Sequence, residues 1–244
     1  MLEKPFRATF ARSWRLLKVF RDERHDPESF YSELSRDSIR QLKTFVEIEG
    51  AKVLDVGGGS NLFRDAFKDA GANYFLLDID LSELTSHGTI DTHMILGSGE
   101  QLPFGNNEFD ITYSSNVIEH VRQPWVLADE MLRVTKKGGT AFISFTLWWG
   151  PWGGHETSPW HYFGGNWAAK RYERKNGHPP KNRYGSTMFG YTVNNAIEWA
   201  KNQNQAEVIQ IFPRYLPRSF WWVLRIPVLR EVVTWNIAMV FKVR

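Results

Sequence analysis

The sequence predicts an α/β fold in which helices cover both faces of a seven-stranded, mostly parallel sheet. Between residues 50 and 147, short apolar segments alternate with segments of helical periodicity, as in a doubly wound sheet. The first apolar segment, Val53–Val56, runs directly into Gly57, Gly58 and Gly59. This strand–glycine–helix order is typical of a nucleotide site at the carboxyl end of the first strand of an open sheet.

The N-terminal segment, residues 1–48, is predicted to be helical. A first helix is expected over Phe6–Phe20, because its apolar residues recur at helical spacing and share one side: Phe6, Phe10, Trp14 and Leu17. A second helix is expected to start at Asp26-Pro27, where proline suits the first helical turn, and to run to about Val46.

The next elements alternate along the chain. A helix over Asn61–Ala70 is closed by Gly71, a helix over Pro124–Val134 is followed by Gly138-Gly139, and a third helix covers Thr192–Lys201. The predicted strands are the apolar and β-branched runs Val53–Val56, Asn73–Asp78, Met94–Leu96, Phe109–Ser114, Thr140–Thr146, Glu207–Phe212 and Thr234–Lys242.

Residues 148–190 interrupt this alternation. They combine many glycines and a basic run with ten aromatic residues: Trp148, Trp149, Trp152, Trp160, Tyr162, Phe163, Trp167, Tyr172, Tyr184 and Phe189. We interpret them as a lid inserted after the fifth strand. The predicted organisation is therefore a helical segment over 1–48, a nucleotide-binding core over 49–147, the lid over 148–190, and the rest of the same sheet over 191–244.

The amino-acid composition restricts the kinds of catalysis available to the protein and the cellular compartment expected for it. The 244 residues include 42% hydrophobic residues, enough for one substantial core, and no cysteine. Disulfides, thiolate catalysis and cysteine-based zinc sites are thereby excluded. No apolar run reaches the roughly 18 residues of a membrane span, and no apolar stretch follows the basic N-terminus as in a signal peptide. We expect a cytoplasmic protein.

Charge is distributed unevenly. The net charge is +3, but residues 1–24 carry +4, residues 213–244 carry +5, and the remainder is negative. Basic ends on an acidic middle predict an anionic partner surface, such as the lipid headgroups at the inner face of a membrane. Nucleic acid is not the expected partner, because no recognition module is present and the predicted core is acidic.

The glycine turn does not match a dinucleotide fingerprint, because Leu62 stands where the third glycine is required. An acidic residue does follow at the end of the second strand. Asp78 lies 19 residues after Gly59, and a carboxylate there can accept hydrogen bonds from both ribose hydroxyls. A carboxylate at this position occurs both in nicotinamide cofactor sites and in other adenosine sites, so it does not decide between these two kinds of cofactor.

Residues 97–120 provide two further motifs: Leu102-Pro103-Phe104, and Phe109-Asp110 together with Asn116–His120. With the glycine turn and the segment around Asp78, four motifs stand in one order and spacing. The segment over about 50–147 thereby resembles the class I S-adenosylmethionine-dependent methyltransferases, which have a Rossmann-like sheet. The aromatic segment more weakly resembles uncharacterised actinobacterial methyltransferases associated with the cell envelope.

The resemblance implies a role for each motif. The methionine part of the cofactor would be lined by Asp55, Gly57, Gly58 and Gly59. Its ribose and adenine would be lined by Asp78, Ile79, Ser98, Gly99 and Glu100. Its sulfonium would lie near Ser114, Asn116 and His120. One position departs from the family pattern. An acidic residue often stands where this chain has Ser98, so the contact to the adenine amino group rests on a hydroxyl.

Two histidines of the lid are candidate general bases. His155 and His161 can each accept a proton near neutral pH, which would help the O-methylation of a hydroxyl acceptor. The alternative is that they pack and form hydrogen bonds within the lid. Their spacing does not match the H-E-x-x-H zinc pattern, so no metal site is predicted.

The sequence therefore predicts an S-adenosylmethionine-dependent methyltransferase that acts on a small-molecule or lipid-linked acceptor, by O-methylation, with peripheral contact to an anionic membrane. Two alternatives stay open. An NAD(P)-dependent oxidoreductase is disfavoured by Leu62 and by the absence of a Tyr-x-x-x-Lys pair. A protein that binds the cofactor without catalysis is distinguished only by an activity measurement.

Overall fold

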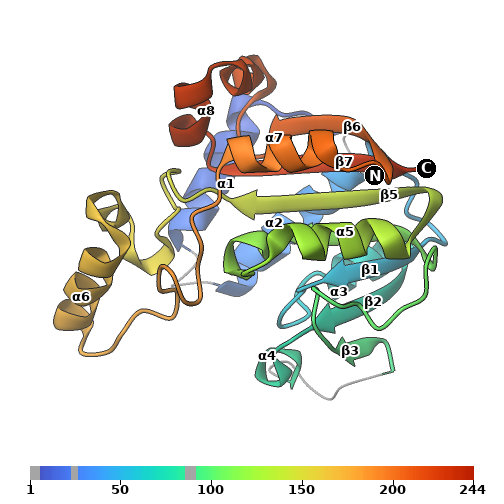
Figure 1. The fold of residues 1–244 in the computed structure, drawn as a ribbon, viewed down its shortest axis with the longest axis horizontal. Coiled ribbons are helices and arrows are strands. Elements are labelled where there is room, and N and C mark those ends of the chain that lie inside the picture. Colours follow the sequence, from blue (N-terminus) through green and yellow to red (C-terminus); the bar gives the residue numbers. More distant parts are fainter. Residues whose placement is uncertain (1–5, 23–26, 86–91) are drawn as a thin grey trace.

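A computed structural model describes residues 6–22, 27–85 and 92–244 and contains the predicted seven-stranded sheet (Figure 1). The strand order is β3-β2-β1-β4-β5-β7-β6. The first five strands are parallel, whereas β7 is antiparallel to both of its neighbours. The strands are β1 (Lys52–Val56), β2 (Asn73–Asp78), β3 (Met94–Leu96), β4 (Phe109–Ser115), β5 (Thr135–Thr146), β6 (Ala206–Pro213) and β7 (Asn236–Val243).

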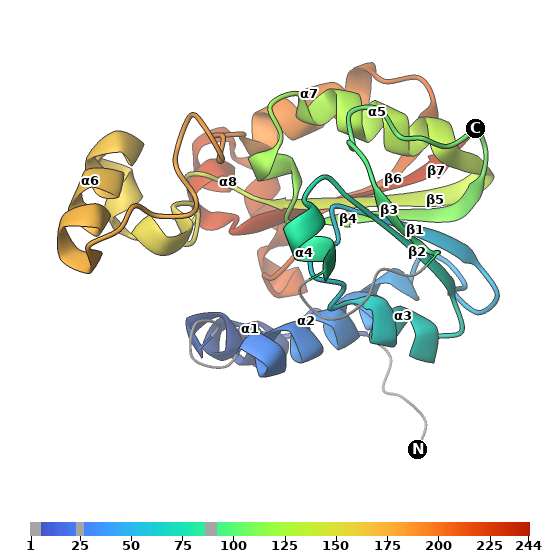
Figure 2. The same ribbon diagram turned by 90° about the horizontal axis from the view of Figure 1, so that it is seen from below.

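Helices cover both faces of the sheet, as expected (Figure 2). One face is packed by α5 (Pro124–Val134) and α7 (Val193–Asn202). The other face is packed by α1 (Phe10–Asp22), α2 (Pro27–Leu42) and α3 (Arg64–Asp69). Each layer therefore buries its own apolar core against one side of the sheet.

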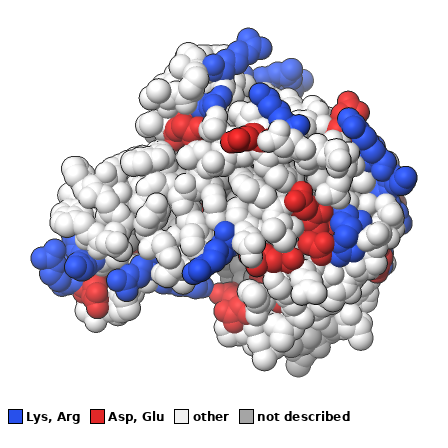
Figure 3. Space-filling model, viewed as in Figure 1, with Lys and Arg blue, Asp and Glu red and all other residues white. Residues whose placement is uncertain are grey.

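Residues 148–190 form an arm that projects beyond the carboxyl ends of the parallel strands (Figure 1). It contains two short 3₁₀ helices, His155–Thr157 and Trp160–Phe163, followed by α6 (Gly165–Asn176). Lys and Arg side chains gather at the far end of this arm (Figure 3). Among the described residues, no helix has the length and apolar character needed to cross a membrane.

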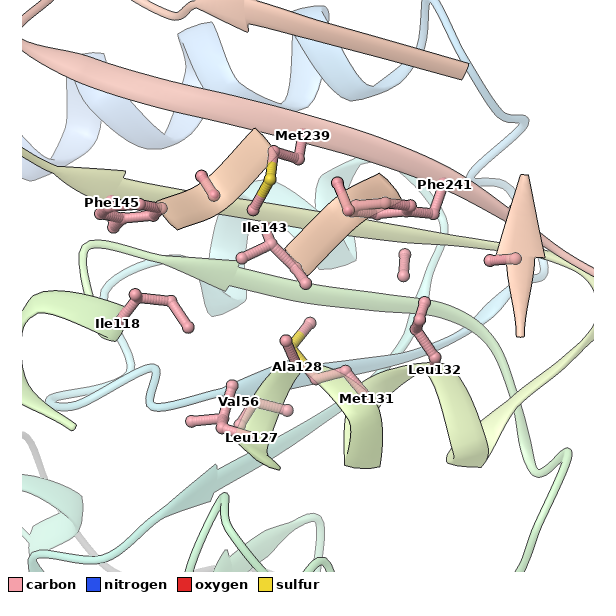
Figure 4. Packing of buried hydrophobic residues seen from close by; sticks show 14 of the residues in the cluster. Val56, Ile118, Leu127, Ala128, Met131, Leu132, Ile143, Phe145, Met239 and Phe241 are labelled. Carbon is pink, nitrogen blue, oxygen red and sulfur yellow. The ribbon is translucent and has the colours of Figure 1, made fainter. Parts of the chain in front are cut away.

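The packing of α5 shows how the apolar residues of one helix fill the core (Figure 4). Leu127, Ala128, Met131 and Leu132 are at most 2% exposed and fall at helical spacing on one face. They pack against buried side chains of the strands and of the segment after β4: Val56, Ile118, Ile143, Met239 and Phe241. This packing fixes the carboxyl ends of β1 and β4 relative to each other.

Several predicted boundaries are wrong for local physical reasons. The helix expected from Asn61 begins at Arg64, because Asn61 has the left-handed φ of 63°. The second helix ends at Leu42 rather than Val46, and Thr44 Oγ1 donates to the carbonyl of Gln41 at that end. Asp26, its expected start, lies outside the described residues.

Strands β5 and β7 also begin at residues other than those expected. β5 begins at Thr135 rather than Thr140, because Thr135 pairs with Phe109 before the glycines. β7 begins at Asn236 because Thr234 closes an unpredicted helix, α8 (Pro227–Val233). The sequence also did not predict α4 (Leu81–Thr85), α6, or the 3₁₀ segment Arg218–Arg225.

The first helix buries the opposite side from the one expected. Phe10 and Trp14 are 63% and 61% exposed, whereas Arg12, Ser13 and Leu16 are buried. The predicted apolar side is therefore exposed at Phe10 and Trp14 and only half-buried at Phe6 and Leu17. Arg12 can be buried because another residue of the protein supplies a carboxylate partner for its guanidinium.

That partner is Asp37 of α2. Its two carboxylate oxygens accept from Nε and Nη2 of Arg12 at 2.6 to 3.1 Å, and both residues are at most 5% exposed. Arg12 Nη1 donates to the carbonyl oxygen of Arg214 at 2.9 Å. The pair therefore joins α1 and α2 to the segment after β6.

Arg214 is itself 1% exposed and meets hydroxyl groups from three elements. Its Nη1 donates to Ser115 and Ser144 at 2.6 Å, and its Nη2 donates to Ser38 at 2.7 Å and to Tyr113 at 2.9 Å. Arg12 and Arg214 thus contribute to the interior and not to a basic surface, which corrects part of the expectation from the basic ends.

We expect Asp37→Ala to lower the free energy of unfolding by roughly 3–5 kcal/mol, because it leaves Arg12 buried without its carboxylate. Urea denaturation followed by circular dichroism measures this. Lys136→Ala is the matched control, since the Lys136–Asp110 pair is 44% and 40% exposed and should contribute under about 1 kcal/mol. Equal losses for the two variants would contradict the assigned role of the buried pair.

Candidate active site

The glycine turn leaves the carboxyl end of β1 as predicted. Gly57 has φ 77°, and a Cβ at that position would lie 2.6 Å from the methyl carbons of Val117. A Cβ on Gly58 would overlap Leu76. Gly59 differs, because the nearest atom to its Cβ position is Glu83 Oε2 at 3.9 Å. The first two glycines are required by internal packing, and a ligand can approach the backbone at the third.

Asp78 connects the end of β2 to this turn. Its Oδ2 accepts from the amide of Gly59 at 2.8 Å, and its Oδ1 accepts from the amide of Asp80 at 2.9 Å. Each carboxylate oxygen keeps a second lone pair for a ligand hydroxyl. The following residue, Ile79, is 73% exposed and presents an apolar surface beside the carboxylate. This combination fits the ribose and adenine of S-adenosylmethionine.

The loop after β3 reaches the same edge. The amide of Gly97 donates to the carbonyl of Asp78 at 2.9 Å, which places Ser98, Gly99 and Glu100 beside the end of β2. The Ser98 hydroxyl accepts from the amide of Glu100 at 3.2 Å and keeps its own proton to donate. Glu100 Oε1 accepts from the amide of Gln123 at 3.0 Å.

Asp55 lies beneath the turn and does not face its open side. It is 2% exposed and accepts from the hydroxyl of Tyr74 at 2.8 Å. Burial raises the pKa of its carboxyl to about 7, although the Tyr74 hydrogen bond opposes the shift; nearby Asp78 adds to it. Its role in this geometry is to hold β1, β2 and the turn together.

Ser114 is near the end of β4 and Asn116 directly follows the strand, but both side chains are engaged by protein groups. Ser114 is fully buried and donates to the carbonyl of Val56 at 2.9 Å, joining the ends of β1 and β4. Asn116 has φ 59°, and its Oδ1 accepts from Asn236 Nδ2 at 2.7 Å. The side-chain oxygen of Asn116 is therefore directed toward β7.

His120 and His155 meet at the carboxyl edge of the sheet. Their ring centroids are 5.1 Å apart, and His120 Nδ1 lies 2.8 Å from the carbonyl oxygen of Thr187. Burial, with His120 and His161 nearby, lowers the pKa of His155 to about 3, so its imidazole is neutral at physiological pH. The two histidines come from the β4 end and the arm.

Glu119 belongs to this group, although no role is predicted for it from the sequence. It is fully buried, and its Oε1 accepts from the amide of Thr146 at 3.0 Å. Burial raises the pKa of its carboxyl, against the influence of His120. Its place in the Glu119-His120 motif was the available signal, but its burial depends on β5.

His161 lies elsewhere, in the interior of the arm. It is 1% exposed, and its Nε2 and Nδ1 lie 3.2 Å from the Gly150 carbonyl and 3.4 Å from the Ser158 hydroxyl. Its ring packs edge-on against Trp148 at 5.3 Å. Burial lowers the pKa of His161. These contacts correspond to the structural alternative for this residue.

The return segment, residues 181–191, consists of the end of the arm and the residue after it, and it borders the site. Lys181 pairs with Glu83 of α4 at 2.8 Å, the amide of Phe189 donates to the carbonyl of Glu119 at 2.7 Å, and the Tyr191 hydroxyl donates to the carbonyl of Val121. The arm is thereby attached on both sides of the carboxyl edge. A separate hollow of about 550 Å³, between α2 and β6, shares no residue with this site.

Asp78→Ala is expected to weaken binding of S-adenosylhomocysteine about 10- to 100-fold, because hydrogen bonds to a charged group contribute about 1.5–3 kcal/mol. Isothermal titration calorimetry measures the affinity. Asp80→Ala is the control: it removes the neighbouring exposed carboxylate, whose hydrogen bonds go to Ser82, and should bind as the wild type does. Undiminished affinity in Asp78→Ala would exclude its contact with the ribose.

Asp55→Asn should change how stability depends on pH. In the wild type, the folded carboxyl retains its proton up to about pH 7, whereas the unfolded chain releases it near 4, so stability falls as pH rises between these values. The asparagine variant does not titrate. Its free energy of unfolding should therefore rise relative to the wild type by on the order of 1 kcal/mol per pH unit in that window. Urea denaturation from pH 4 to 8 measures this, and a constant difference would contradict it.

Comparison with known proteins agrees with this geometry. Residues 54–143 match a family model described as a methyltransferase domain. The chain is 45% identical over 251 residues to an uncharacterised methyltransferase of Mycobacteroides abscessus, covering 98% of this chain and 96% of the relative. It is 45% identical over 244 residues to an uncharacterised methyltransferase of Mycobacterium tuberculosis, covering 96% of this chain and 95% of that one.

Solved structures share the fold at low identity. An S-adenosylmethionine-dependent methyltransferase from Mesorhizobium loti has a TM-score of 0.56 at 15% identity, covering 84% of this chain and 95% of that one. A methyltransferase of the same dependence from Aquifex aeolicus has a TM-score of 0.53 at 14% identity, covering 95% and 98%. The chain belongs to the class I S-adenosylmethionine-dependent methyltransferases, and S-adenosylmethionine is its cofactor.

Proposed function

We propose that this enzyme transfers the methyl group of S-adenosylmethionine to a hydroxyl of an amphipathic, lipid-linked acceptor at the surface of an anionic membrane. The observation that supports the membrane is an exposed aromatic group on the arm, formed by Trp160, Phe163 and Trp167. Their ring centroids lie 6.0 to 6.2 Å apart, and the side chains are 38%, 72% and 44% exposed. Large exposed rings of this kind are favoured at membrane interfaces.

Positive charge accompanies these rings. The guanidinium of Arg171 lies 4.0 Å from the ring centroid of Trp160. The same helix, α6, carries three more cations and one carboxylate: Lys170, Arg174, Lys175 and Glu173. Figure 3 shows the Lys and Arg side chains at the end of the arm. Basic residues beside aromatic rings match the interface of an anionic leaflet, where each cation contributes about 1 kcal/mol.

The arm also connects that surface to the site of transfer. Its return segment contacts Glu119 and Val121 directly after β4. In open α/β sheets, ligands bind at the carboxyl ends of the strands, where this segment lies. An acceptor with an apolar tail in the membrane and a hydroxyl at this edge would therefore contact both regions of the protein.

Of the two candidate bases, His155 is the better placed to activate the acceptor. It lies beside His120 at the carboxyl edge, whereas both ring nitrogens of His161 face protein groups. We assign the positioning of the acceptor hydroxyl to the region of His120 and His155. The nicotinamide-dependent oxidoreductase is not favoured, because the matching family and relatives are methyltransferases.

Cosedimentation with liposomes tests the membrane surface. We expect binding to vesicles of phosphatidylglycerol and phosphatidylcholine at low salt, and weaker binding at high salt or to phosphatidylcholine alone. The double variant Phe163→Ala/Trp167→Ala should bind at least about tenfold more weakly, since burying each large apolar side chain contributes about 1.5–3 kcal/mol. Ile209→Ala, on β6, is the control with an exposed apolar residue away from the arm.

Loss of binding in Phe10→Ala/Trp14→Ala but not in the arm variant would move the contact to α1 and contradict the proposal for the arm. Absence of salt-sensitive binding in the wild type would exclude the membrane altogether. Methyltransferase family membership is unaffected by either result.

A further inference from the structure

Glu119, His120 and His155 form a compact polar group at the carboxyl edge of the sheet. One ligand-type atom from each of the three residues lies within 4.8 Å of the other two. Two residues come from the 3₁₀ turn after β4, Ile118–His120, and the third comes from the arm. The group therefore forms only when the arm is folded against the core.

The hydrogen bonding of His120 leaves one ring nitrogen available. Its Nδ1 lies 2.8 Å from the carbonyl oxygen of Thr187, and because a carbonyl only accepts, this nitrogen carries the hydrogen. The neutral ring then has its lone pair on Nε2. Histidines that bind metals are commonly oriented in this way, with the other ring nitrogen donating to a backbone carbonyl.

Glu119 and His155 each contain a buried polar atom without a partner. Glu119 is fully buried, and its Oε1 accepts from Thr146, but its Oε2 has no hydrogen-bond partner among the described residues. The buried Nδ1 of His155 has no partner there either. Burying an unpaired carboxylate oxygen is costly unless a cation or donor satisfies it.

We propose that Glu119, His120 and His155 bind one divalent transition-metal ion, with Zn²⁺ the best match. One carboxylate and two imidazoles are a ligand set that zinc uses, and they leave a coordination position for an exogenous oxygen. Bond lengths of about 2.0–2.2 Å require ligand atoms nearer than 4.8 Å, so the side chains must approach by about 1 Å on binding. Mg²⁺ should bind weakly, because it prefers oxygen ligands.

The bound ion would position the hydroxyl oxygen of the acceptor. This inference rests on the proposed function. A hydroxyl oxygen bound in the open position has a lowered pKa and loses its proton to solvent. The oxygen then forms a C–O bond with the methyl carbon while the C–S bond breaks, and S-adenosylhomocysteine leaves. In this arrangement His155 acts as a ligand, and no free imidazole has to accept the proton.

An internal ion pair between Glu119 and protonated His120 is the competing explanation. It satisfies the carboxylate without a metal, but it leaves the buried nitrogen of His155 unpaired. The two explanations differ in whether the protein binds a metal ion at all.

Metal titration of the full-length protein, after removal of metals with a chelator, tests the proposal. We expect one equivalent of Zn²⁺ by calorimetry, and one equivalent of Co²⁺ with the strong visible absorption of four- or five-coordinate cobalt. His155→Ala should bind Co²⁺ at least 100-fold more weakly and lose that absorption. His178→Ala is the matched control, because His178 is an exposed arm histidine outside the group, and it should bind within twofold of the wild type.

Binding of S-adenosylhomocysteine by His155→Ala verifies that the variant is folded, and Glu119→Gln provides a second ligand variant. Absence of one-equivalent binding in the wild type, or equal binding in wild type and His155→Ala, overturns the metal site and favours the ion pair. These titrations contain neither lipid nor acceptor. Their failure is therefore distinguishable from failure of the membrane proposal, which the liposome experiment measures separately.

Discussion

The buried guanidinium of Arg214 is the constraint on which the carboxyl edge of this sheet depends. A cation removed from water has to be surrounded by acceptors, and here they come from β4, β5 and α2. Its carbonyl oxygen accepts in turn from Arg12, which Asp37 neutralises. A single side chain therefore determines how the N-terminal helices, two central strands and the segment after β6 meet.

That edge is also where the cofactor turn and the arm begin. Ser114 and Ser115 are consecutive residues, and they bond to Val56 of β1 and to Arg214 respectively. The position of the glycine turn is thereby linked to the same polar network. The arm leaves β5 at Thr146, whose amide holds Glu119, and returns along Thr187 and Phe189. Cofactor residues and arm residues are brought together by the ends of neighbouring strands.

Two buried carboxylates at this edge, those of Asp55 and Glu119, differ in their hydrogen bonding because their neighbours differ. Asp55 is satisfied by Tyr74 and has an elevated pKa that suits an internal structural residue. Glu119 is satisfied at only one oxygen and faces two imidazoles. The difference is set by the neighbours that β2 and the arm supply, and it underlies the different roles that we assign to the two residues.

The local sequence was sufficient for the alternation of strands and helices, for the glycine turn and for Asp78, because hydrophobic periodicity and glycine placement act over a few residues. The cofactor followed from the resemblance of four short motifs to those of the class I methyltransferases. The local sequence could not predict which side of α1 is buried. Phe10 and Trp14 have the periodicity of a core face, yet the burial of Arg12 depends on Asp37, 25 residues away. The meeting of Glu119 and His120 with His155 was equally non-local. Only the tertiary structure decided these features, because an isolated segment carries no information about the distant partner that makes burial of its charge favourable.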